Sequence, residues 1–118
     1  MLVLNFWATS CGPCKRELPL LNSYYQLQEK AGLRVVAITT EDSLPIYKLR
    51  PVAADLAIPM ARSYRGNYGG PPKFLPTNFI IDRDGILRYA KAGELMLDTL
   101  NELLVPLLQA SPAADPTT

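Results

Sequence analysis

Two apolar runs with a helix between them constrain the fold of this chain most. Residues 2–8 (LVLNFWA) and 33–40 (LRVVAITT) are almost continuously apolar or β-branched, which is typical of strands covered on both faces. The segment between them predicts a helix from Ser10–Cys11 to about Lys30. A strand, a helix and a second strand in this order predict a parallel pair joined by a right-handed crossover, and so an α/β domain.

The predicted first helix carries its own start and stop signals. Pro13 falls in its first turn, where a missing N–H does no harm, and Gly32 is a helix stop. Pro19 lies inside the span, so we expect a kink there. The apolar side is predicted from the spacing of four residues: Leu18, Leu21, Tyr25 and Leu27.

The middle of the chain is less regular. A broken helix is predicted around 45–56, a short strand or extended segment over IPMARSY (58–64), and a loop over 65–74. The segments PTNFIID (76–82) and ILRYAKA (86–92) flank Arg83-Asp84-Gly85 and predict a β-hairpin.

A last amphipathic helix is predicted from Leu95 to about Leu108, and Pro106 is expected to kink or end it. Its apolar side is predicted from leucine spacing: Leu97, Leu100, Leu104 and Leu107.

Length and composition indicate one domain. The 118 residues suit a single core, which we expect over residues 1–109, with a disordered tail over 110–118. The net charge of +1 gives no electrostatic reason to expect nucleic acid as a partner, and no apolar run reaches the roughly 18 residues that a membrane span needs. The opening residues have no basic leader and no small-residue cleavage site, so they are not read as a signal peptide. Because a buried strand seldom opens a protein, we expect a segment upstream.

Cys11 and Cys14 are the only cysteines, and their spacing and position favour redox chemistry. The first N–H groups of a helix are unpaired and its dipole stabilises a thiolate at Cys11, the form that attacks disulfides. Cys14 lies one turn further along the same side and should be more shielded, which suits a resolving thiol.

A cysteine pair can also bind a structural metal or form an inert disulfide. A structural metal site needs about four ligands, whereas the chain has two cysteines and no histidine, so we expect no metal. An inert structural disulfide closing so short a loop would remove little unfolded-state entropy. The redox role is therefore preferred, with no cofactor beyond the two thiols.

VLNFWATSCGPCKRELP (3–19) resembles the active-site strand and helix of the thioredoxin-like superfamily, and more narrowly the TlpA/ResA-type thiol-disulfide oxidoreductases. FLPTNFIIDRDGILRYAKAGEL (74–95) is similar to a second segment of that family, P-T-x-F-x-I-D-x-x-G-x-I…G. The resemblance implies a thioredoxin-like fold, in which a central mixed β-sheet is flanked by helices.

The resemblance also implies roles for individual residues. Cys11 would attack, Cys14 would resolve, and Leu75–Pro76 would be a cis peptide facing the dithiol, where the backbone pairs with an incoming peptide. Glu17 matches an acidic residue that tunes the thiols in this subgroup, although a solvated helix carboxylate is the commoner fate of a glutamate. Asn5 stands where thioredoxin keeps a buried aspartate, so Glu17 is the available proton acceptor.

A substrate-binding surface is implied around the dithiol. We expect Trp7 to pack beside the cysteines, with simple core packing as the alternative. Ser10 replaces the usual tryptophan, so this surface should be smaller and more polar. The full set of expected substrate-binding residues is Trp7, Ser10, Gly12, Pro13, Leu75, Pro76 and Thr77.

The predicted function is reduction of protein disulfides by dithiol exchange through CGPC. A disulfide oxidase or isomerase is the alternative within the class, and a redox-sensing binding module with little turnover is the alternative outside it. A peroxide-reducing role is disfavoured, because that pattern has a lone cysteine three residues after Thr or Ser. Partners would be protein thiols and disulfides and an upstream thiol donor, and we expect a monomer. The resemblance implies a periplasmic location and a link to cytochrome c maturation; the expected upstream segment could carry a membrane anchor.

Overall fold

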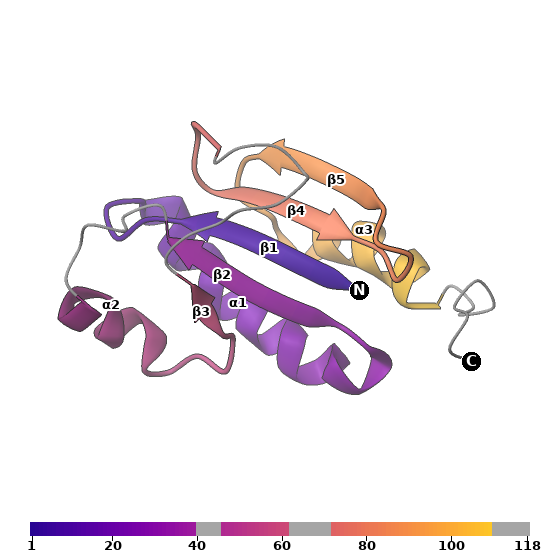
Figure 1. The fold of residues 1–118 in the computed structure, drawn as a ribbon, viewed down its shortest axis with the longest axis horizontal. Coiled ribbons are helices and arrows are strands. Elements are labelled where there is room, and N and C mark those ends of the chain that lie inside the picture. Colours follow the sequence, from indigo (N-terminus) through magenta and orange to yellow (C-terminus); the bar gives the residue numbers. More distant parts are fainter. Residues whose placement is uncertain (40–45, 62–71, 110–118) are drawn as a thin grey trace.

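The structure is a computed structural model that describes residues 1–39, 46–61 and 72–109. Figure 1 shows the order of its elements along the chain. They are β1 (Leu2–Trp7), α1 (Gly12–Gln28), the short 3₁₀-helix η1 (Glu29–Ala31), β2 (Arg34–Thr39), α2 (Ile46–Ala53), β3 (Met60–Ala61), β4 (Thr77–Ile81), β5 (Leu87–Ala92) and α3 (Leu97–Gln109).

The sheet is mixed, as predicted. Its strand order is β3-β2-β1-β4-β5, so the first strand of the chain is central. β1 runs parallel to β2 and antiparallel to β4, and β4 pairs with β5 as the predicted hairpin. The short strand β3 runs parallel to β2 at one edge. The α/β class is therefore confirmed, and the parallel pair comes from the two apolar runs.

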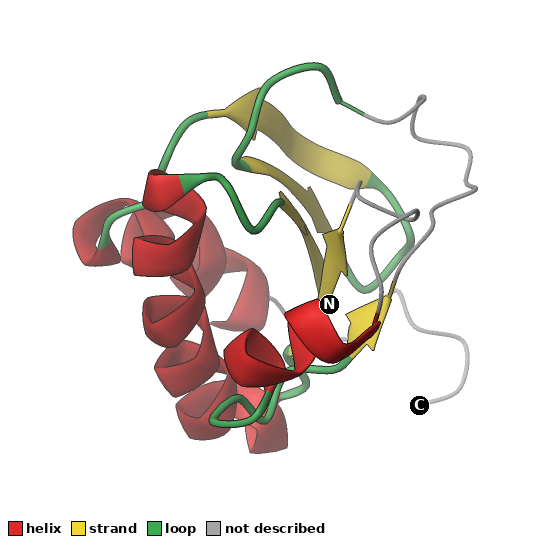
Figure 2. Cartoon of the chain, turned by 90° about the vertical axis from the view of Figure 1, so that its left-hand side faces the viewer, coloured by secondary structure: helices red, strands yellow, loops and turns green. Residues whose placement is uncertain are grey.

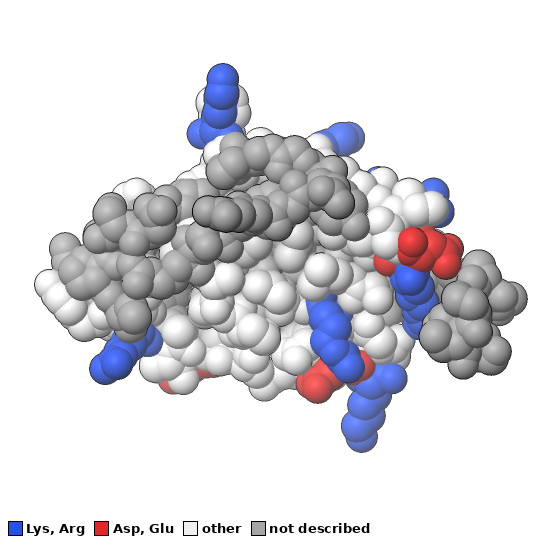
Figure 3. All heavy atoms as spheres, in the orientation of Figure 1, with Lys and Arg blue, Asp and Glu red and all other residues white. Residues whose placement is uncertain are grey.

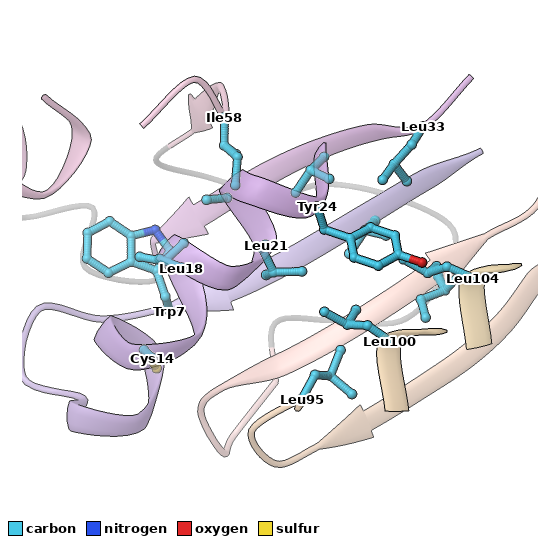
Figure 4. Close-up of a cluster of buried hydrophobic side chains, with 14 residues drawn as sticks. Trp7, Cys14, Leu18, Leu21, Tyr24, Leu33, Ile58, Leu95, Leu100 and Leu104 are labelled. Carbon is cyan, nitrogen blue, oxygen red and sulfur yellow. The ribbon is translucent and has the colours of Figure 1, made fainter. Parts of the chain in front are cut away.

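Helices α1 and α3 lie against one face of the sheet, as the two views in Figures 1 and 2 show. Period-two alternation sends Val3 and Trp7 of β1 into the core beneath these helices, while Leu4 and Phe6 point to the other face. Figure 4 shows the core on the helical side, where Leu18 and Leu21 of α1 lie among side chains from the strands and α3. The smaller cluster on the opposite face brings the Phe6 and Phe79 rings edge to face, 5.1 Å between centroids.

The prediction for α1 is confirmed in its start and wrong in part of its apolar side. Cys11 is the N-cap and Pro13 lies in the first turn. Leu18 and Leu21 are buried and Tyr25 is partly buried against the core, as predicted, but Leu27 is 78% exposed. Tyr24, which was not predicted, is also buried and donates from its hydroxyl to Asn101 Oδ1 over 3.1 Å. The reason is that each step of three residues falls short of a full turn, so that position 27, nine residues after Leu18, points to about the opposite side of the helix.

The expected stop at Gly32 is confirmed. Gly32 caps η1 with a φ of 104°, a left-handed conformation that other residues adopt with difficulty. α1 continues through Pro19 to Gln28, and the expected kink at that proline stays a prediction.

The C-terminal helix α3 begins two residues later than predicted. Leu95 is buried but lies before the helix, and Leu97 is 50% exposed, so its assignment to the apolar side was wrong. Leu100 and Leu104 are completely buried. Pro106 does not end the helix, which runs three residues further to Gln109, so that alternative was wrong, and the expected kink at this proline stays a prediction.

Other predictions hold or lie outside the described residues. The helix expected around 45–56 is present as α2, and the short strand expected within 58–64 is present as β3. Most of the predicted loop 65–74 and the predicted tail 110–118 fall outside the residues that the structure describes, so the limits of the domain stay a prediction.

Charged side chains are scattered over the surface. On the face in Figure 3, the lysines and arginines of the described residues stand apart around the edge, and some of them lie beside acidic side chains. Within the described residues, no helix is both long and apolar enough to cross a membrane.

Candidate active site

The two cysteines lie where β1 passes into α1. The Cys11 N–H donates to Ala8 O over 3.1 Å, which turns the chain after the strand, and Cys11 then caps the helix. Its Sγ accepts a hydrogen bond from the Cys14 backbone N–H over 3.2 Å. The two side chains form a disulfide with their Cα atoms 5.3 Å apart. A backbone N–H of the first helical turn therefore donates to the first sulfur, which favours a thiolate there when the disulfide is reduced.

The two sulfur-bearing residues differ in exposure, as predicted. Cys11 is partly exposed, whereas Cys14 is completely buried in the main core. Trp7, also buried, belongs to the same cluster, and Figure 4 shows its side chain near that of Cys14. An incoming disulfide can therefore reach Cys11 and not Cys14.

Glu17 is buried under the sheet and not solvated. It lies one helical turn after Cys14, and none of its side chain is accessible to solvent. Oε1 accepts from Asn5 Nδ2 over 2.5 Å and from Asn78 Nδ2 over 3.1 Å, while Oε2 accepts from the Leu95 backbone N–H over 2.6 Å. The expectation that a helix glutamate is usually solvated does not apply here, because three donors from distant segments converge on the carboxylate.

Burial raises the pKa of Glu17, because the carboxylate loses its hydration. The three hydrogen bonds from Leu95, Asn78 and Asn5 oppose this by stabilising the charged form, and the nearby Glu94 charge adds to the rise. A carboxyl with a raised pKa, one helical turn from a buried cysteine, can take up and return a proton more readily than an ordinary glutamate.

The predicted cis peptide is present at Leu75–Pro76. Two hydrogen bonds hold this turn: Thr77 Oγ1 donates to Phe74 O over 2.6 Å, and the Gly93 N–H donates to Pro76 O over 2.8 Å. Thr77 is opposite Phe6 in the sheet register, so the turn lies at the same end of the sheet as the cysteine loop. That it faces the dithiol stays a prediction.

The remaining predicted site residues divide by exposure. Ser10 and Gly12 are exposed and Pro13 is partly exposed, while Trp7 and Thr77 are buried. Trp7 also lines a cavity of about 210 Å³ beside α2 and β3, and its indole Nε1–H has no hydrogen-bond partner among the described residues. The expected core packing of Trp7 is thus observed, and contact of these residues with substrate stays a prediction.

Two participants in the site were not predicted. Asn78 is a polar residue inside an apolar strand, and that break in the pattern was the available signal. Its meaning required the register, which places Asn78 directly opposite Asn5. Leu95 contributes through its backbone, which no side-chain pattern can indicate.

The family model described as AhpC/TSA family matches residues 1–90. Among curated proteins, ResA thiol-disulfide oxidoreductases of Bacillus thuringiensis subsp. konkukian and Geobacillus thermodenitrificans are 34% and 30% identical to this chain. These matches cover 86% of this chain and 60% and 59% of the relatives, so the chain spans about three fifths of the length of these proteins. The predicted resemblance to ResA-type proteins is confirmed.

Solved structures agree with the predicted fold. A protein described as the thiol:disulfide interchange protein DsbE of Chlorobium tepidum superposes with a TM-score of 0.73 at 27% identity, over 91% of this chain and 79% of that one. StoA of Bacillus subtilis superposes with a TM-score of 0.71 at 24% identity, over 87% and 81%. The mixed five-stranded sheet with its helices is thus a thioredoxin-like fold, and the chain belongs to the AhpC/TSA family.

Proposed function

We propose that this chain is a thiol-disulfide oxidoreductase that reduces protein disulfides by dithiol exchange. The observation that carries the proposal is the disulfide between a partly exposed Cys11 at the start of α1 and a completely buried Cys14. Relatives over most of this chain are named thiol-disulfide oxidoreductases, which supports the same class of chemistry.

The reaction begins from the reduced pair. The Cys11 thiolate attacks one sulfur of a substrate disulfide, a mixed disulfide forms, and the first substrate thiolate leaves. Cys14 then loses its proton and attacks Cys11 Sγ, which releases the second substrate thiolate and closes the Cys11–Cys14 disulfide. Two electrons pass from the dithiol to the substrate, and the two substrate thiolates take up protons.

Glu17 is the proposed proton acceptor for Cys14. Both residues are completely buried and lie one turn apart on α1, so solvent is a poor base for this thiol. Asn5, which stands where thioredoxin keeps an aspartate, is an amide and cannot take the proton.

Substrate would bind at the sheet end that carries the cysteine loop and the Leu75–Pro76 turn. Ser10, Gly12 and Pro13 would contact it beside Cys11, and the backbone before Pro76 would pair with it as an added strand. Trp7 and Thr77, which are buried, would support this surface from beneath.

The physiological setting is part of the same proposal. The resemblance to TlpA/ResA-type proteins supports an extracytoplasmic, periplasmic location, protein substrates of the kind used in cytochrome c maturation, and an upstream thiol donor that reduces the pair again. We propose that the chain acts as a monomer.

The test is insulin reduction with dithiothreitol as the electron source. Wild type should accelerate precipitation, Cys11→Ser should abolish the acceleration, and Cys14→Ser should accumulate mixed disulfides that name the substrates. If both variants match wild type, the proposal is wrong. Slow turnover with a partner affinity that changes on oxidation would favour a redox sensor instead.

A further inference from the structure

Asn5 and Asn78 are a cross-strand pair of buried amides beneath the cysteine helix. They lie directly opposite each other on the antiparallel strands β1 and β4, and neither is accessible to solvent. Asn5 Nδ2 donates to Asn78 Oδ1 over 2.9 Å, so the two side chains are hydrogen-bonded to each other as well as to Glu17. A sheet interior seldom contains two opposed asparagines, because each brings polar groups that need partners.

Both amides direct their N–H groups at the same carboxylate oxygen. Oε1 of Glu17 accepts from each of them, and Oε2 accepts from Leu95. The pair thus supplies donors and no acceptor to Glu17. These hydrogen bonds stabilise the charged carboxylate, and part of that stabilisation is lost when Glu17 is protonated.

One group in this cluster has no partner. Asn5 Oδ1 is buried and makes no hydrogen bond within the described residues. An amide retained in the core with its oxygen unsatisfied costs stability. A contribution to stability therefore explains the asparagine pair poorly, whereas a role in binding the Glu17 carboxylate explains it directly.

We propose that Asn78, together with Asn5, is a positioning residue for dithiol exchange: the two amides fix the Glu17 carboxylate beside Cys14 and decide how readily it takes a proton. The inference rests on the proposed function, since it assigns the partners of the proposed proton acceptor. It adds a residue, Asn78, that acts through Glu17 and touches neither sulfur in the described contacts.

Other groups near Glu17 are charged or titratable. Glu94, in the turn before α3, raises the pKa of Glu17, and its own carboxylate is bound to Arg16 of α1 over 3.0 Å. Burial raises the pKa of Tyr89 of β5, and the nearby Glu17 charge adds to the rise. Cys14 lies on the same helix as Glu17. Among the described residues, the side chains of β1 and β4 that bind Glu17 are the two neutral amides of Asn5 and Asn78.

The first test is the pH profile of the reduction rate for Asn78→Leu. Removing a hydrogen bond to a charged group is worth roughly 1.5–3 kcal/mol, so the acidic limb should move to higher pH by roughly one to two units. Asn22→Leu is the matched control. Asn22 is a buried asparagine of α1, the helix that carries Glu17, and its Oδ1 accepts from the Ala57 N–H over 2.6 Å. Its replacement should lower stability without moving the acidic limb. An unmoved limb in folded Asn78→Leu would overturn the proposal.

Glu17→Gln separates this inference from the proposed function. It should remove the acidic limb, and adding Asn78→Leu to it should then leave the pH profile unchanged. If Glu17→Gln leaves the limb of wild type in place, Glu17 is not the proton acceptor, and the role proposed for it in catalysis fails first.

A measurement on the unaltered protein covers the case in which Asn78→Leu does not fold. The Glu17 carboxyl carbon and the side-chain NH₂ resonances of Asn5 and Asn78 are followed by NMR against pH. The three should shift with one midpoint, and the Asn22 NH₂ should not follow it. If the Asn5 and Asn78 resonances do not shift with the Glu17 titration, the inference is overturned whatever the kinetics show.

Discussion

The Leu95 backbone N–H donates to Glu17 Oε2 over 2.6 Å, across 78 residues of chain. This contact joins the cysteine helix to the segment before α3, and the adjacent pair Arg16–Glu94 spans the same two segments at the surface. Leu95 itself is buried, so the donor has little freedom to move away. The buried carboxylate therefore depends on the C-terminal part of the domain as well as on the sheet.

The raised pKa of Glu17 predicts how stability depends on pH. The folded state binds a proton that the unfolded state has released, so the free energy of unfolding should fall as pH rises from the ordinary glutamate pKa, about 4.3, to the raised value. Each unit of pKa rise corresponds to about 1.4 kcal/mol. Glu17→Gln should remove this dependence, as measured by urea denaturation from pH 4 to pH 8.

A glutamate at the surface provides the control for that experiment. Glu102 is an exposed residue of α3, and Glu102→Gln should keep the wild-type pH dependence. Identical curves for Glu17→Gln and wild type would show that the carboxyl titrates alike in the folded and unfolded states.

Two leucines of α3 that lie three residues apart differ in burial. Leu100 is completely buried and Leu97 is 50% exposed. Leu100→Ala should lower the free energy of unfolding by about 2–5 kcal/mol through lost burial and the cavity left behind, and Leu97→Ala by less than about 1 kcal/mol. Chemical denaturation measures both; equal losses would mean that the helix turns a different face to the sheet.

The hairpin turn depends on the charge of Asp82. Its Oδ1 accepts from the backbone N–H groups of Asp84 and Ile86, and its Oδ2 accepts from Arg88 Nε over 2.5 Å. The hydrogen bond from Ile86 contributes most to lowering the Asp82 pKa. The stabilisation is therefore present above the ordinary aspartate pKa and is lost as pH falls through the lowered value.

Asp82→Asn tests this because the amide keeps the Oδ1 acceptor and removes the charge. Its melting temperature should be below that of wild type at pH 7, and the gap should close as pH falls below about 4. Asp84→Asn, in the same turn, should show a smaller gap. A gap for Asp82→Asn that persists unchanged at pH 2 would contradict the role of its charge.

The reduction potential of the Cys11–Cys14 pair tests the direction of electron flow. Equilibration in dithiothreitol or glutathione buffers should give a value near the thioredoxin end of the scale, about −270 mV. For a two-electron couple about 30 mV corresponds to about 1.4 kcal/mol, so the method resolves small differences between the oxidised and reduced forms. A value near about −120 mV would instead indicate an oxidant or isomerase.

Local sequence patterns predict the central strands, the hairpin and the start of the first helix. Continuous apolar runs predicted β1 and β2, Arg83-Asp84-Gly85 predicted the hairpin, and Pro13 with the two cysteines predicted the start of α1. These features depend on backbone preferences and on periodicity within one segment, which a sequence carries directly.

Tertiary structure decided which side chains meet. Glu17 is indistinguishable by pattern from a solvated helix residue, and its burial follows from donors on β1, β4 and the segment before α3. Leu97 fits the apolar stripe of α3 and yet is 50% exposed, in the first turn of that helix. The physical reason is that periodicity fixes the face of an element, while the extent of the opposing surface and the strand register fix what that face touches.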